Sequence, residues 1–218
     1  MSPLDNNTIP YRSILIHGIL RLVTDQLADV DPRVRRSRES VLAAAVGLFV
    51  AGGPRTVTVD AVSEASGVAK TTIYRHWEDR AHLLADTYRA CLPVVPAPDP
   101  DLSPEDALRQ VVRSLTQGIG SPPARPALPH LIATPLDPVE SRALPPGVMD
   151  QAFAPLVGAL ERAASSGLIA SRTKVAEAKH QIVGFVVMSA LDPQCAMNDE
   201  LADRIVDLFL AGRRSGPD

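Results

Sequence analysis

The chain has 218 residues, of which 45% are hydrophobic and 22% charged, and this balance is typical of a folded protein with one or two domains. No apolar run reaches the roughly 18 residues that span a bilayer, and the first residues lack the pattern of a signal peptide. With only Cys91 and Cys195, a disulfide framework is excluded. We therefore expect a cytoplasmic protein with no membrane partner.

The net charge of −3 does not by itself suggest a nucleic-acid partner, but the charge is unevenly placed. Residues 31–92 carry nine Lys or Arg against seven Asp or Glu, a balance of +2, whereas residues 93–218 carry eleven against fifteen, a balance of −4. A locally basic N-terminal third indicates a module that faces an anion. A solvated charge cluster is the alternative that composition leaves open.

Helical periodicity dominates the sequence, and strand alternation is almost absent. Apolar spacing predicts a helix over 9–30, which ends at Asp31-Pro32 because the residue before proline is pushed out of the α region. A second helix is predicted over 34–51, and Gly52-Gly53-Pro54 ends it.

Two short helices follow, over 59–65 and 69–75, with Gly67 between them and Thr58 as the cap of the first. Asp79 is a plausible cap for a longer helix that ends near Leu92. Most of the regular structure predicted for the rest of the chain is also helical.

Beyond a proline-rich linker, Ser103-Pro104-Glu105-Asp106 has the features of a helix start, and that helix ends at 118–120. Residues 121–147 hold eight prolines and allow only short helical pieces. Further helices are predicted over 147–166, 174–190 and 198–211. The predicted fold is all-α, with a small N-terminal bundle and a larger C-terminal one.

Two short helices joined by a tight turn with glycine form a helix-turn-helix pattern, whose second helix enters the major groove of DNA. The second helix here is rich in polar side chains between Lys70 and His76. Periodicity alone leaves a polar helical hairpin on the protein surface as an alternative.

The segment TVDAVSEASGVAKTTIYRHWEDRAHLL resembles the DNA-binding domain of TetR-type transcriptional regulators. The resemblance covers residues 36–92, and residues 93–218 share only the family's general layout. It implies a helix-turn-helix DNA-binding domain (33–80) and a helical regulatory and dimerisation domain (81–218). Residues 1–32 would then be an N-terminal extension, which is unusual for the family. This extension is either a helix that packs on the bundle or the result of a start codon placed too far upstream.

The resemblance also implies roles for single residues. Base edges or the adjoining backbone would be contacted by Lys70, Thr71, Thr72 and Arg75, and phosphates or the groove wall by Tyr74, His76 and Arg80. Thr58 offers a hydroxyl and free backbone amides to a phosphate. One position departs from the family, since Asp60 stands where arginine is frequent. Asp60 either accepts from cytosine or caps its own helix, and we favour the cap.

Three arginines, Arg35, Arg36 and Arg38, stand at the start of the helix expected over 34–51, ahead of most of its apolar residues. Family members often extend a basic arm from this point, and arginine suits a narrow minor groove. The alternative is a solvated start to the helix.

As a function, the resemblance implies a homodimeric repressor that binds a palindromic operator on double-stranded DNA. A small, mostly apolar effector would release it. Candidate effector-binding residues are Leu108, Val111, Leu115, Leu131, Met149 and Phe153. Candidate residues of the dimer interface are Leu156, Leu160, Val183 and Val187.

Two other classes of function remain as alternatives: a DNA-binding regulator or architectural protein with no effector, and an all-α enzyme that uses His130 and His180. No second ligand stands at metal-binding helical spacing from His130, and no Ser-His-Asp or Cys-His set is evident. We therefore expect no metal, no cofactor and no enzymatic activity.

Overall fold

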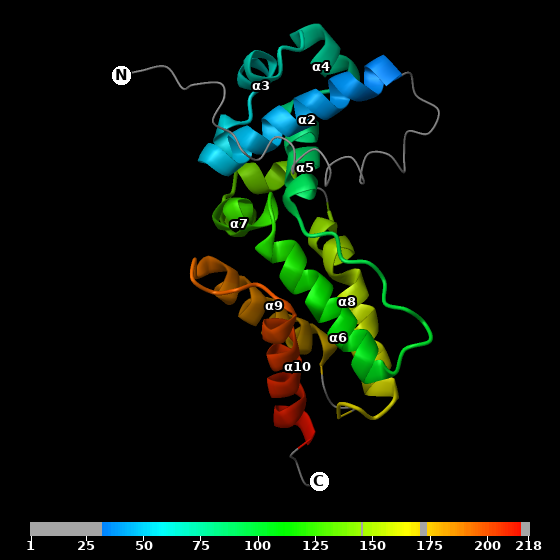
Figure 1. Ribbon diagram of the computed structural model, residues 1–218. Coiled ribbons are helices and arrows are strands. Elements are labelled where there is room, and N and C mark those ends of the chain that lie inside the picture. Colours follow the sequence, from blue (N-terminus) through cyan, green and yellow to red (C-terminus); the bar gives the residue numbers. More distant parts are fainter. Residues whose placement is uncertain (1–31, 145, 171–173, 215–218) are drawn as a thin grey trace. The chain divides into compact units, whose positions relative to one another are not determined.

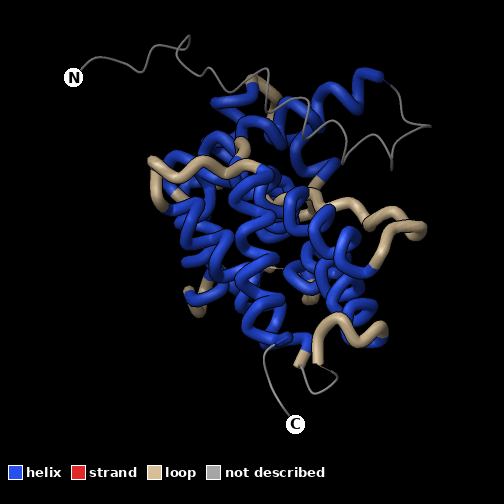
Figure 2. Tube along the Cα trace, turned by 60° about the horizontal axis from the view of Figure 1, so that its bottom comes forward, coloured by secondary structure: helices blue, strands red, loops and turns tan. Residues whose placement is uncertain are grey.

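The computed structural model describes residues 32–144, 146–170 and 174–214, and every regular element among them is helical (Figure 2). The helix predicted over 9–30 lies outside these residues. The chain divides into two compact units, Met1–Cys91 with Pro129–Pro145, and Leu92–Leu128 with Pro146–Asp218. This division differs from the predicted boundary after residue 80, because the helix that follows packs within the first unit.

From Pro32 to Cys91, the described part of the first unit consists of four α-helices and a short 3-10 helix (Figure 1). They are α2 (Pro32–Gly52), η1 (Pro54–Thr56), α3 (Val59–Ser66), α4 (Lys70–His76) and α5 (Arg80–Cys91). The buried stripe of α2 consists of Val41, Leu42, Ala45, Val46 and Phe49.

Local signals determine where the short helices begin and end. The Thr58 hydroxyl accepts a 3.2 Å hydrogen bond from the Ala61 amide and caps α3, as predicted. Gly67 ends α3 with φ 71°, a left-handed conformation that only glycine adopts without steric cost. Asp79 accepts from the His82 amide at 2.9 Å and caps α5, also as predicted.

Residues Pro129–Pro145 belong to the first unit although they are distant from it in sequence. They include the end of α7 (Ala124–Ala133), η2 (Thr134–Leu136) and η3 (Glu140–Ala143). The His130 ring lies edge-on to Phe49, with ring centroids 5.7 Å apart. A Cβ on Gly53 would come within 2.8 Å of His130 Nδ1, so this close approach requires a glycine.

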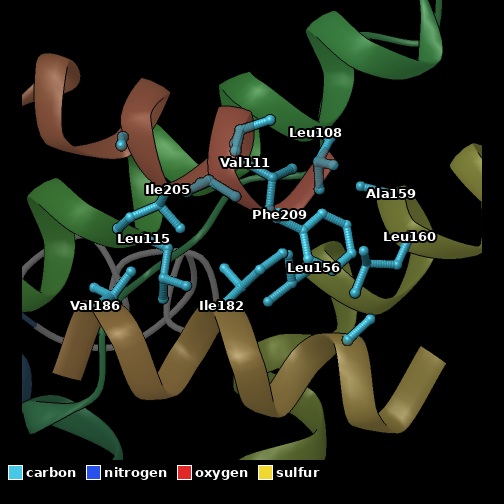
Figure 3. Packing of buried hydrophobic residues seen from close by; sticks show 14 of the residues in the cluster. Leu108, Val111, Leu115, Leu156, Ala159, Leu160, Ile182, Val186, Ile205 and Phe209 are labelled. Atoms are coloured by element: carbon cyan, nitrogen blue, oxygen red, sulfur yellow. The ribbon is translucent and has the colours of Figure 1, made fainter. Parts of the chain in front are cut away.

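The second unit is a helical bundle made of α6 (Pro104–Gly120), α8 (Val148–Ser165), α9 (Val175–Leu191) and α10 (Asp199–Arg214). Ser103 caps α6 by accepting from the Asp106 amide at 3.1 Å, as the start signal predicted. Aliphatic side chains from all four helices fill the core (Figure 3). On the surface, Arg113 binds both carboxylate oxygens of Asp203 at 2.9 and 2.7 Å and joins α6 to α10.

Within the described part of the chain, no helix combines the length and apolar character needed to cross a membrane.

Candidate nucleic-acid interface

Helices α3 and α4 form the predicted helix-turn-helix, with Gly67 in the turn between them. Buried Val62 and Ile73 anchor the two helices to the unit. The opposite side of α4 is polar and open to solvent, since Lys70, Thr71, Tyr74 and Arg75 are exposed. Thr72 and His76 are half-buried. The predicted base-reading residues therefore share one short helix that packing leaves largely uncovered.

A cluster around Trp77 holds the C-terminal end of α4. The buried Trp77 indole donates from Nε1 to Asp86 Oδ2 at 2.9 Å. The same oxygen accepts from Arg38 at 2.8 Å, and the Arg38 guanidinium lies 5.3 Å from the Trp77 ring centroid. This cluster ties α4 to both α2 and α5, so the recognition helix is held at the end that follows its polar residues.

The three candidate arm arginines lie inside α2 and do not precede it, which corrects the predicted basic arm. α2 begins at Pro32, two residues earlier than the periodicity indicated. Arg35 lies 3.8 Å from Glu39 in an i,i+4 ion pair, and Arg36 is exposed. The Arg38 guanidinium is hydrogen-bonded to Asp86 and lies over the Trp77 ring. Its side chain thus has a structural role that charge counting could not reveal.

His76 is less accessible for a contact with DNA than the sequence suggested. Its Nε2 is 3.2 Å from the Ser37 hydroxyl of α2, and its ring meets Trp77 edge-on with centroids 5.5 Å apart. Burial, together with the nearby positive charge of Arg38, lowers the pKa of His76. We therefore expect the His76 imidazole to be neutral near pH 7.

Arg80 is half-buried and bonded to other residues of the first unit. Its guanidinium donates to the carbonyls of Val57 and Pro54 at 2.9 and 2.7 Å, and to Glu140 Oε2 at 3.2 Å. Glu140 is buried and lies 60 residues further along the chain. Sequence reasoning gave Arg80 a phosphate contact and missed this arrangement, because two acceptors are backbone carbonyls and the third is remote.

Asp60 does not cap α3, which corrects the interpretation we favoured. The cap is Thr58, and the Asp60 carboxylate instead lies 2.6 Å from Nζ of Lys70. The acid at this unusual position is thus paired with the first residue of the recognition helix.

The candidate effector-binding residues do not form one group. Leu108, Val111 and Leu115 lie in the core of the second unit (Figure 3). Phe153 belongs to the same buried cluster. Met149 is exposed on α8. Leu131 belongs to the first unit, where its carbonyl accepts from the Tyr88 hydroxyl at 2.8 Å.

Two of the candidate interface residues are buried in their own protomer. Leu156 and Leu160 are 1% and 0% exposed and belong to the core of the second unit, so they are not available to a partner. Val183 and Val187 on α9 are half-buried. The large apolar side chains that the described parts of α9 and α10 expose are Phe185, Met188, Leu191 and Leu208.

Two family models match the chain. The N-terminal model, described as bacterial regulatory proteins of the tetR family, covers residues 41–87, and the tetracyclin repressor-like C-terminal domain covers residues 98–209. The chain belongs to the TetR family. The helix-turn-helix of α3 and α4 is therefore a TetR DNA-binding motif, and the second unit contains most of the TetR C-terminal domain.

Relatives of known sequence or structure agree with this family. The uncharacterized HTH-type transcriptional regulator YdeS of Bacillus subtilis is 33% identical over 76 residues, which are 34% of this chain and only 38% of that protein. The TetR regulator TylP of Streptomyces fradiae has a similar structure, with a TM-score of 0.63, 20% identity and coverage of 83% and 88% of the two chains.

A third similar structure is FadR of Bacillus subtilis, solved in complex with stearoyl-CoA, with a TM-score of 0.60, 15% identity and coverage of 80% and 98%. At these identities the structural matches establish the fold alone. They confirm the predicted all-α class with an N-terminal helix-turn-helix and a C-terminal helical domain.

Proposed function

We propose that this TetR-family regulator is a homodimeric repressor that binds a palindromic operator and is released by a small, mostly apolar effector. The observation that carries the proposal is the solvent-exposed polar face of α4, held at its far end by the Trp77 cluster. Such a helix contributes little to packing, but its side chains suit the base edges and phosphates of a major groove.

The exposed apolar face of α9 and α10 supports the dimer. Phe185 and Met188 on α9 and Leu208 on α10 are 48%, 66% and 63% exposed, and we take these large exposed apolar side chains as candidates for a protein interface. A two-fold dimer that binds a palindromic operator must hold its two copies of α4 about 34–36 Å apart, which is one helical turn of DNA.

The second unit is the proposed site of the effector. Leu108, Val111 and Leu115 from α6 and Phe153 from α8 line an apolar interior, which suits an apolar ligand. Because these side chains are part of one packed core, an effector that entered here would displace them, and its binding would be coupled to movement of α6 and α8.

The segment Pro129–Pro145 offers a route for this movement. It follows α6 and precedes α8 in the chain, yet it packs in the first unit through His130, Leu131 and Glu140. Through the bond from Arg80 to Glu140, it reaches the carbonyls of Pro54 and Val57 just before α3. A shift of the helix ends in the second unit would therefore disturb the base of the helix-turn-helix.

Selection of bound sequences from a random DNA pool tests the proposal directly. We expect a two-fold symmetric site, and Arg75→Ala should cost about 1–3 kcal/mol and relax the preference at one base position. A screen for release from that site follows, with long-chain acyl-CoA thioesters among the compounds because FadR holds one. Enrichment of no sequence would contradict the proposal, and tight operator binding that no compound weakens would favour a regulator without an effector.

A further inference from the structure

The Asp60 carboxylate lies next to the first residue of the recognition helix. Its Oδ1 is 2.6 Å from Nζ of Lys70, so an ion pair joins α3 to α4. Both side chains are open to solvent, at 78% exposed for Asp60 and 55% for Lys70. The hydrogen bond and charge of Asp60 raise the pKa of Lys70, which keeps the ammonium protonated.

The ion pair between Asp60 and Lys70 should contribute too little to the stability of the fold to explain why it is present. An exposed ion pair contributes little to the free energy of unfolding, because water screens the charges and two flexible side chains must be ordered. The N-terminus of α3 is already capped by Thr58. The helix pair that faces DNA carries Asp60 and Glu64 against Lys70 and Arg75, and so has no net charge when His76 is neutral. On a surface that binds a polyanion, two acidic side chains lower the affinity, because they repel its charges.

We propose that Asp60 is a specificity-determining residue of the DNA-binding surface and acts through Lys70. The carboxylate competes with DNA phosphates for the lysine ammonium. Nonspecific complexes depend almost wholly on phosphate contacts, so the competition weakens them most. At the operator, base contacts from the other residues of α4 hold the helix in place, and the loss is smaller. Asp60 therefore widens the gap between operator and nonspecific affinity. This inference rests on the proposed DNA-binding function.

Binding of the full-length protein to two duplexes tests the inference. One is the operator selected with the wild-type protein, and the other is a scrambled duplex of equal length and composition. For Asp60→Asn we expect affinity to rise about 5–10-fold on the scrambled duplex and about 2-fold on the operator. On the scrambled duplex the slope of log affinity against log salt should steepen by about 0.9, the value for one added phosphate contact.

Matched variants separate this role from general electrostatics. Glu64→Gln removes the same charge from the same helix face, and it should change both affinities equally. Asp60→Glu keeps the carboxylate and should retain the wild-type selectivity. In a Lys70→Met background, Asp60→Asn should have almost no effect, because the residue through which it acts is gone. Circular dichroism melting should be unchanged in all five variants.

An unchanged ratio of operator to scrambled affinity in Asp60→Asn would overturn the inference. A gain that persists without Lys70, or one that Glu64→Gln reproduces, would overturn it as well. A wild-type protein that selects no sequence would instead contradict the proposed function. In that case the salt slopes on the scrambled duplex would still decide whether Asp60 withholds Lys70 from phosphate.

Discussion

Trp77 and Asp86 are joined by a 2.9 Å hydrogen bond from the indole Nε1 to the carboxylate, and this contact fixes the end of the recognition helix. The Asp86 carboxylate also accepts from Arg38 and Arg89, each at 2.8 Å. One acidic side chain on α5 therefore satisfies a buried indole and two guanidinium groups, so its removal should be costly.

We expect Asp86→Ala to lower the free energy of unfolding by about 1–3 kcal/mol, because a buried N–H group loses its acceptor. Urea denaturation followed by Trp77 fluorescence measures this, since Trp77 is the single tryptophan. Glu78→Ala, at an exposed acid nearby, should change stability by less than about 0.5 kcal/mol. Equal effects from the two variants would mean that the cluster does not hold α4.

The contact of Arg80 with Glu140 should couple the two residues energetically. In a double-mutant cycle with Arg80→Met and Glu140→Gln, we expect an interaction energy of about 1–2 kcal/mol in urea denaturation. Both single variants should weaken operator binding, because the base of α3 loosens in each. If Arg80 acted instead by touching phosphate, only Arg80→Met would weaken binding.

Tyr88 should help to hold Pro129–Pro145 in the first unit. Its hydroxyl is buried and donates to the Leu131 carbonyl at 2.8 Å, and burial raises the pKa of Tyr88 to about 12. Tyr88→Phe should cost about 1 kcal/mol of stability and speed amide hydrogen exchange in this segment. Tyr74→Phe, at an exposed residue of α4, should change neither quantity. Unaltered exchange in Tyr88→Phe would show that packing alone holds the segment.

His76 and His82 of the first unit should have pKa values on opposite sides of the ordinary histidine value of 6.5. Burial lowers the pKa of His76, whereas the hydrogen bond to Asp79 raises that of His82. His76 therefore favours folding above pH 6.5, and this contribution is lost as pH falls toward its folded pKa. The contribution of His82 is complete below 6.5 and is lost as pH rises through its folded pKa.

Imidazole proton NMR, assigned with His76→Gln and His82→Gln, measures the two titrations. Asp79→Asn should bring the His82 pKa back toward 6.5 and leave the His76 pKa where it is. Coincident titration curves in the wild-type protein would contradict the surroundings described for both rings.

The exposed apolar face of α9 and α10 should form the dimer contact. We expect Met188→Glu to convert the protein to a monomer at micromolar concentration and to reduce operator binding more than tenfold, because only a dimer spans both half-sites. Sedimentation velocity measures the state of assembly. Leu136→Glu introduces the same charge at a residue of the other unit that is 78% exposed, and it should leave the dimer intact. A wild-type monomer that binds its operator tightly would exclude the proposed dimer.

The sequence alone was sufficient for the helices and for the DNA-binding motif. Helix periodicity, the caps Thr58, Asp79 and Ser103, and the glycine at 67 are local signals that act within a few residues. The helices expected within the described residues therefore agree with the structure to within a few residues, whereas the one expected over 9–30 lies outside them. The residues of the recognition helix were equally evident, since they are consecutive.

Only the tertiary structure decided which charged and apolar side chains are free to act. Arg38, Arg80 and Asp60 had plausible roles toward DNA or as a cap, yet their partners are 48, 60 and 10 residues away. Leu156 and Leu160 have the same apolar character as Phe185 and Met188, but the first two are buried and the last two are exposed. Periodicity identifies the apolar positions of a helix, but which of its sides is covered depends on how the helices pack together.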